Sequence, residues 1–92
     1  MSSNQNQRVA NPLKYLRDAL DTTIYVKLKD GSEYVGLLKV TDSTMNLVLE
    51  NSVEVKDGKQ VVAKLGKILI RGSMVQYVSF NPEIAVPDVE IK

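Results

Sequence analysis

Arg71 and Gly72 lie between two apolar runs, residues 68–70 and 75–80, that are rich in strand-forming residues. A glycine at such a joint permits a positive φ and a tight turn, which holds the arginine at the end of a strand. A guanidinium held in this way can stack on a planar base and donate forked hydrogen bonds. Taken alone, Arg71 is more typical of a solvated turn.

A second polar group precedes a predicted strand. Residues 42–46 begin with turn-forming side chains and lead into alternating apolar positions, so Asn46 points away from the predicted core. An asparagine amide offers both a hydrogen-bond donor and an acceptor, which suits a planar polar ligand. Considered without the second motif, Asn46 as an Asx-turn residue and Asp42 as a turn starter are equally good interpretations.

The composition excludes several classes of function. The 92-residue chain contains no cysteine and no histidine, so disulfides, thiolate zinc sites and the commonest general base are absent. No carboxylate pair has the pattern of a polar catalytic cleft. We therefore expect a protein that is not an enzyme and has no metal and no cofactor. The net charge of +1 requires any nucleic-acid site to be local or repeated between subunits.

The chain also lacks the features of a membrane protein. No apolar run approaches the ~20 residues that a membrane span needs, and residues 1–7 are polar, unlike a secretory signal. The expected location is therefore cytoplasmic, with no membrane partner.

The amino-terminal part predicts an arm and a short helix. Residues 1–10 are rich in Asn, Gln and Ser and predict a disordered arm. Asn11 is the expected cap and Pro12 the first helical residue. Leu13, Leu16 and Leu20 form one apolar stripe, so the helix is expected to cover an open end of a small barrel.

The remaining chain has the two-residue period of β-strands. Asp30-Gly31 and Asp57-Gly58 predict tight hairpins, and Gly36 within a strand predicts a sharp bend. Five strands are expected, at residues 23–29, 34–40, 45–55, 60–70 and 75–80. Residues 81–92, which include two prolines, predict an extended tail.

The fourth predicted strand is apolar on both faces. Leu65 and Leu69 share one face, whereas Ile68 and Ile70 share the other, and residues 75–80 have a similar double character. We expect a barrel of this size to have only one interior, so the surplus apolar surface predicts a subunit interface formed by strand edges.

In this order and spacing, the helix, Gly36, residues 42–49, a variable hairpin and residues 70–75 resemble the two-part signature of the Sm and Sm-like proteins, most closely the archaeal ones. The resemblance covers residues 11–80. It implies a mainly all-β fold, a five-stranded, strongly bent antiparallel barrel of the SH3-like type with a short amino-terminal helix. It also implies a homo-oligomeric ring of six or seven copies, with seven favoured, in which the fourth strand of one copy pairs with the fifth of the next.

The resemblance further implies a uridine pocket at the pore of the ring. Asn46 would pair with the polar edge of uracil, Asp42 would brace Asn46, and Arg71 would stack on the base. Gly72 would supply a backbone amide. Two positions depart from the family pattern. Thr44 stands where an aromatic residue or histidine often completes the sandwich, a change that weakens each base contact by about 1 kcal/mol or more.

The other departure is Ser73, at a position where many archaeal members have aspartate.

Three functions follow from these observations. The first is a ring that binds single-stranded U-rich RNA as a chaperone or scaffold in RNA processing or turnover, with RNA-processing proteins as candidate partners. The second is a protein-binding scaffold ring with a decayed base pocket. The third is a monomeric SH3-like adaptor.

Overall fold

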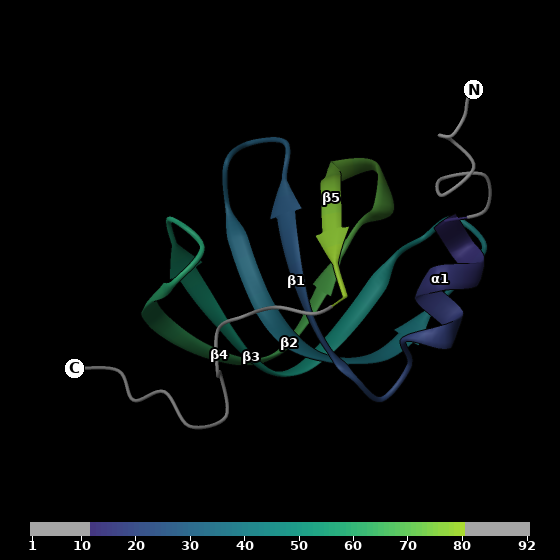
Figure 1. Ribbon diagram of the computed structural model, residues 1–92, viewed down its shortest axis with the longest axis horizontal. Coiled ribbons are helices and arrows are strands. Elements are labelled where there is room, and N and C mark those ends of the chain that lie inside the picture. The colour runs from purple at the N-terminus through teal and green to yellow at the C-terminus, as the bar shows by residue number, and fades with distance from the viewer. Residues whose placement is uncertain (1–11, 81–92) are drawn as a thin grey trace.

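The computed structural model describes residues 12–80, so the predicted arm, the cap at Asn11 and the predicted tail lie outside the described residues. Five antiparallel strands form one bent sheet, with a short helix at one end (Figure 1). This architecture confirms the predicted fold class. The elements are α1 (Pro12–Asp18), β1 (Thr23–Leu28), β2 (Glu33–Thr41), β3 (Leu47–Lys56), β4 (Gln60–Ile70), the 3₁₀ helix η3 (Gly72–Met74) and β5 (Val75–Ser79).

Helix α1 begins at Pro12, as the sequence predicts, and buries Leu16 in the core. The predicted stripe is wrong at its end, because Leu20 lies beyond the helix and is exposed. The chain leaves the helix through Ala19, whose carbonyl accepts a hydrogen bond from the Thr22 hydroxyl, and through Asp21, whose φ is 67°. Ala19 is buried in place of Leu20.

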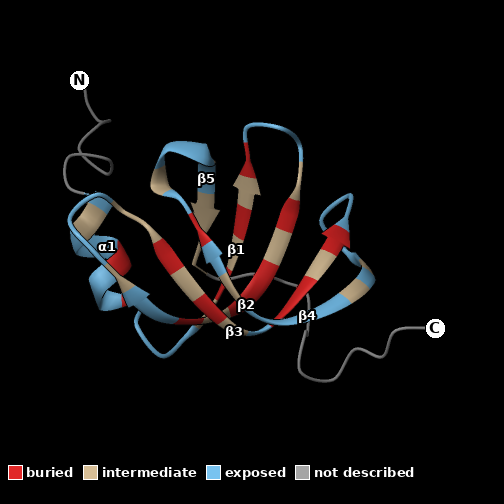
Figure 2. Cartoon of the chain, turned by 180° about the vertical axis from the view of Figure 1, so that it is seen from behind, coloured by how far each residue is buried: buried red, intermediate tan, exposed pale blue. Residues whose placement is uncertain are grey.

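The strands follow the predicted alternation closely. Ile24, Val26 and Leu28 of β1 are buried, whereas the residues between them are half-buried (Figure 2). One prediction is wrong by two residues: β3 begins at Leu47 because Met45 has a φ of 65°, which is incompatible with a strand.

Gly36 lies where the pairing of β2 with β3 shifts register. A Cβ atom at this position would lie 2.9 Å from the Cβ of Ser52 on β3. The missing side chain therefore allows the two strands to approach as the sheet bends, which is the role that the sequence predicts for this glycine.

Apolar residues are buried on both faces of the bent sheet. Ile24 and Val26 belong to the main core cluster, whereas Tyr25 packs against a second cluster of Val35, Val53 and Val55. Since successive residues of a strand point to opposite faces, the two clusters lie on opposite sides of β1. The expectation of one interior is therefore wrong.

Strands β4 and β5 are consecutive along the chain but lie at opposite edges of the sheet. The strand order is β4-β3-β2-β1-β5, so neither β4 nor β5 has a partner on its outer side within residues 12–80. Both edges also carry exposed apolar side chains: Val62, Leu65 and Leu69 on β4, and Tyr77 on β5. Leu69 is 68% exposed, the highest value among the exposed large apolar residues of this region.

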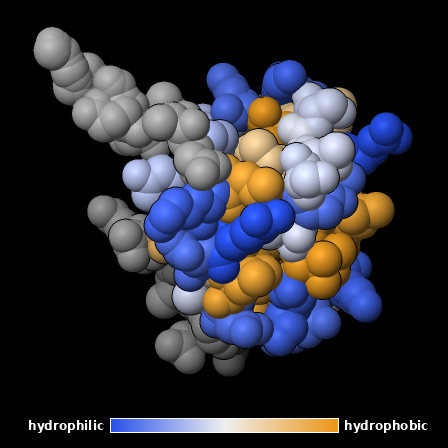
Figure 3. All heavy atoms as spheres, turned by 90° about the vertical axis from the view of Figure 1, so that its right-hand side faces the viewer, coloured by the Kyte–Doolittle hydropathy of each residue, from blue (hydrophilic) through white to orange (hydrophobic). Residues whose placement is uncertain are grey.

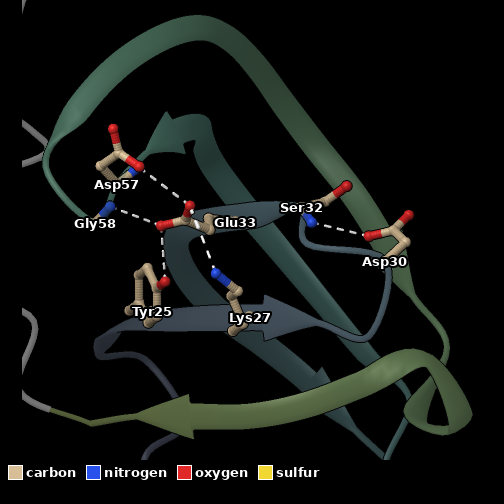
Figure 4. A network of polar contacts seen from close by, with 7 residues as sticks. All are labelled: Tyr25, Lys27, Asp30, Ser32, Glu33, Asp57 and Gly58. Carbon is tan, nitrogen blue, oxygen red and sulfur yellow. Dashed lines mark hydrogen bonds and ion pairs between the residues drawn. The ribbon is translucent and has the colours of Figure 1, made fainter.

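A buried carboxylate joins three parts of the sheet (Figure 4). Glu33 on β2 accepts hydrogen bonds from the Tyr25 hydroxyl at 2.8 Å and from the backbone N–H groups of Asp57 and Gly58 at 3.1 and 2.7 Å. The Lys27 ammonium lies 3.8 Å from the same carboxylate. Glu33 therefore holds the β3–β4 hairpin against β1 and β2.

The pKa values of this network reflect both burial and hydrogen bonding. Burial raises the pKa of Glu33, but the hydrogen bonds from Tyr25 and the hairpin, together with Lys27, outweigh it and leave the pKa lowered. Burial and the hydrogen bond to Glu33 raise the pKa of Tyr25. The ionised carboxylate and the protonated phenol are thus the forms that the fold stabilises.

We expect Glu33→Gln to lower the free energy of unfolding by about 1–3 kcal/mol at neutral pH, because the amide brings N–H donors toward the backbone donors of the hairpin. The folded-state pKa of Glu33 is lowered, so its contribution is complete above the ordinary glutamate pKa and is lost as the pH falls through the folded value. Urea unfolding at neutral and acidic pH measures both effects.

Glu54→Gln on β3 is the matched control, because the structure gives its side chain no ion pair and no hydrogen bond within residues 12–80. If the two variants were equally stable at neutral pH, the structural role of Glu33 would be refuted.

Candidate nucleic-acid interface

The loop between β2 and β3 is organised around the carboxylate of Asp42. Its Oδ1 atom accepts hydrogen bonds from the backbone N–H groups of Thr44 and Asn46, at 2.9 and 3.1 Å. The backbone N–H of Met45 donates to the carbonyl of Asp42 at 2.8 Å. A single aspartate thus fixes three consecutive residues of the loop.

The hydrogen bonds to Asp42 also determine its ionisation. The hydroxyl of Thr44, which donates at 2.7 Å, is the main cause of a lowered pKa at Asp42, and the N–H groups of Asn46 and Thr44 add to the effect. The carboxylate therefore stays ionised to more acidic pH than an ordinary aspartate, and with it the loop keeps its hydrogen-bond acceptor.

The side chain of Asn46 connects this loop to the segment after β4. Its Nδ2 group donates to Asp42 Oδ2 at 3.1 Å and to Thr44 Oγ1 at 3.0 Å. Its Oδ1 atom accepts a hydrogen bond from the backbone N–H of Gly72 at 2.8 Å. The two sequence motifs therefore meet at one side chain, although they are 26 residues apart.

Gly72 is required at this joint for a reason that differs from the prediction. It is absent from the positive-φ residues of the described chain, so the predicted left-handed turn is wrong. A Cβ atom here would overlap the carbonyl oxygen of Thr44 and would lie 2.8 Å from the carbonyl carbon of Met45. The glycine is needed because two backbones are in contact, and the chain turns through η3 instead.

Arg71 and Ser73 flank Gly72, and both are exposed. The Arg71 side chain borders an apolar hollow that is also lined by Leu28, Leu69 and Met74, and it makes no ion pair within the described part of the chain. Ser73 lies in η3, and no hydrogen bond of its side chain is seen with residues 12–80. Neither side chain contacts Asn46 by a hydrogen bond.

The structure therefore brings together four of the six predicted site residues: Asp42, Thr44 and Asn46 through side-chain contacts, and Gly72 through its backbone. Arg71 and Ser73 adjoin Gly72 along the backbone, but their side chains form no hydrogen bond with this cluster within residues 12–80. The sequence reasoning missed the use of the Thr44 hydroxyl, for which the Asp42-x-Thr44 spacing of an Asx or ST turn was the available signal.

The side of the molecule on which α1 lies has a mixed surface, with hydrophilic atoms next to hydrophobic patches (Figure 3). Within residues 12–80 no helix is long and apolar enough to cross a membrane. In the same range no three acidic, cysteine or histidine side chains are grouped so that they could hold a metal ion.

A family model for the LSM domain matches residues 14–80. An snRNP Sm-like protein from Methanosarcina barkeri is 50% identical over 68 residues, which are 74% of this chain and 93% of the relative.

Two solved structures are also similar. The Pyrococcus abyssii Sm protein, determined in complex with a uridine heptamer, is 39% identical with a TM-score of 0.70, and the match covers 75% of this chain and 96% of that one. A heptameric archaeal Sm protein is 36% identical with a TM-score of 0.65, over 72% and 94% of the two chains.

We expect Gly72→Ala to lower the free energy of unfolding by about 1–3 kcal/mol, because the new methyl group meets backbone atoms that no side-chain rotation can move away. It should also shift the NMR signals of the Thr44 and Asn46 amides, since the contact with Asn46 Oδ1 is lost. Thermal or urea unfolding and a ¹H–¹⁵N spectrum measure these changes.

Ser73→Ala, at the next and exposed position, should change stability by no more than about 0.5 kcal/mol. Equal stability of the two variants, with unchanged loop signals, would contradict the proposed backbone contact.

Proposed function

The chain belongs to the LSM family, and from this premise we propose that it assembles into a closed ring of identical copies that binds single-stranded U-rich RNA at its pore. The family assignment confirms the resemblance to archaeal Sm-like proteins and agrees with the expectation of a protein that is not an enzyme. The observation that carries the proposal is the hydrogen bond between Asn46 and Gly72, which joins the two halves of the motif into one polar site.

The two edges of the sheet support assembly. A strand edge presents unpaired N–H and C=O groups, and β4 and β5 add exposed apolar side chains to them. Pairing β4 of one copy with β5 of the next satisfies both edges of every copy if the rotation closes. The similar archaeal Sm protein is a heptamer, which favours seven copies over six for this chain.

The polar site supports base recognition. The Asn46 side chain is held by three partners, Asp42, Thr44 and the Gly72 N–H. Arg71, which is exposed, immediately precedes Gly72. Stacking of a base on a guanidinium is a cation–π contact worth about 0.5–2 kcal/mol, and it does not depend on the identity of the base. In this proposal Arg71 contributes affinity and Asn46 contributes selectivity.

Repetition of a weak binding site around a ring raises the overall affinity for a strand. The net charge of one copy is only +1, but six or seven copies place as many Arg71 guanidinium groups around one pore. A strand that reaches several pockets gains avidity without any new type of contact. The similar Pyrococcus abyssii protein was determined with a uridine heptamer, which makes oligouridine the first ligand to test.

We propose that the ring acts in the cytoplasm as an RNA chaperone or scaffold in RNA processing or turnover, with RNA-processing proteins as partners. Ser73 then lies beside the pore, in the segment that leads from the base site into β5. The protein-scaffold alternative stays an outcome of the RNA-binding test below.

The purified protein should have a mass in solution of about 71 kDa for seven copies or about 61 kDa for six copies of the 10.2 kDa chain. Leu69→Lys should shift it toward the monomer, because the charge replaces an apolar side chain at the β4 edge that is already exposed in the single copy. Light scattering on a size-exclusion column measures the mass.

Val40→Lys is the matched control for assembly. Val40 is 53% exposed, but it lies on β2, where it pairs with Val48 of β3, and not on either edge strand of the sheet. A wild-type mass near 10 kDa at high concentration would favour the monomeric adaptor and refute the ring.

Oligo(U) should bind more tightly than oligo(A), and Arg71→Ala should weaken binding of both by about twofold to thirtyfold for each base that loses its stacking partner. Asn46→Ala should weaken oligo(U) preferentially, because it removes the polar group that faces the base. Fluorescence anisotropy at low salt, on material whose ring mass has been verified, measures these affinities. An intact ring without affinity for any single-stranded RNA would instead support the protein scaffold.

A further inference from the structure

Thr44 is exposed, yet its hydroxyl both donates and accepts a hydrogen bond. It donates to Asp42 Oδ1 at 2.7 Å and accepts from Asn46 Nδ2 at 3.0 Å. We infer that Thr44 is a positioning residue for base recognition: its hydroxyl binds the spare donor of Asn46, so that the Asn46 amide offers a base only an acceptor and selects uracil over cytosine. This inference rests on the proposed function.

The orientation of the Asn46 amide follows from its partners. The Asp42 carboxylate can only accept hydrogen bonds, and the backbone N–H of Gly72 can only donate. The amide nitrogen must therefore face Asp42 and the amide oxygen must face Gly72, as the distances of 3.1 and 2.8 Å indicate. Turning the amide over would oppose oxygen to oxygen at Asp42 and N–H to N–H at Gly72.

The direction of the Thr44 hydroxyl is determined in the same way. Its proton goes to the Asp42 carboxylate, so its oxygen presents a lone pair to Asn46. The two Nδ2 protons of Asn46 are then both engaged, one by Asp42 and one by Thr44. What remains is one lone pair of Oδ1, because a carbonyl oxygen has two and Gly72 uses one.

An amide that presents one free acceptor distinguishes the two pyrimidines. At ring position N3, uracil has an N–H donor, whereas neutral cytosine has an unprotonated nitrogen that only accepts. Uracil can donate to the free lone pair of Asn46 Oδ1, but cytosine would bring two acceptors together, which costs binding energy. Without the Thr44 hydroxyl, one Nδ2 proton of Asn46 would be available to cytosine.

The experiment compares oligo(U), oligo(C) and an oligomer of 3-methyluridine, in which a methyl group replaces the N3 proton, on the intact ring by fluorescence anisotropy. For the wild type we expect tighter binding of oligo(U) than of the other two. Thr44→Val keeps the branched shape but lacks the hydroxyl, so the ratio of oligo(U) to oligo(C) affinity should fall about threefold to tenfold, the equivalent of one hydrogen bond. Thr44→Ser should restore the ratio.

Two controls separate selectivity from general loss of binding. Ser43→Ala removes the neighbouring exposed hydroxyl, which makes no side-chain hydrogen bond in the network around Asp42, and should leave the ratio unchanged. Arg71→Ala should weaken all three oligomers alike, because stacking is sequence-tolerant.

The outcomes are distinguishable. A wild-type ring that does not bind oligo(U) overturns the proposed function and this inference together. Binding of oligo(U) with the same ratio in Thr44→Val and the wild type overturns the inference alone, as does an equal loss of the ratio in Ser43→Ala.

Discussion

The hydrogen bond from the Gly72 N–H to Asn46 Oδ1 is the contact on which the rest of the candidate site depends. It can form only because residue 72 has no Cβ atom, since the backbone of the β2–β3 loop occupies that space. It can be specific only because Asp42 already holds Asn46 from the other side. The same contact places Arg71 next to the loop. The β2–β3 loop alone is a local turn, and it becomes a candidate site through its contact with a segment 26 residues away in the sequence.

The bend of the sheet brings these segments together. Gly36 allows β3 to approach β2, and Ser52 donates to the carbonyl of Gly66, where β4 adopts a φ of 74° and its pairing with β3 is irregular. Each of these positions lacks a large side chain at the point where the strands curve. The bend lets both faces of the sheet bury apolar residues, but it leaves β4 and β5 as opposite, unpaired edges within the described chain.

The fold could be predicted in large part from the sequence, because alternation and Asp-Gly turns are local signals. The core positions of β1 and the bend at Gly36 are examples. The wrong or missing predictions have different causes. Leu20 fits a helical stripe, but the helix ends before it, and Gly72 fits a turn glycine, although a distant carbonyl group is what requires it. The contact of Thr44 with Asp42 is local, but the family pattern at this position directed the interpretation toward a lost stacking partner and away from the Asx or ST turn.

The position of the site within the topology links recognition to assembly. Residues 71–74 connect β4 directly to β5, so the segment that carries Arg71 and Gly72 joins the two edges that the proposed ring would pair. In a single copy this segment is anchored by Asn46 and by the bond from Lys29 N–H to the Met74 carbonyl. Pairing at both edges would restrain it on either side, which reduces the conformational freedom that a bound base must otherwise remove. An exposed site on one copy would thereby become a preorganised one, and the apolar side chains of β4 and β5 are what would drive that change.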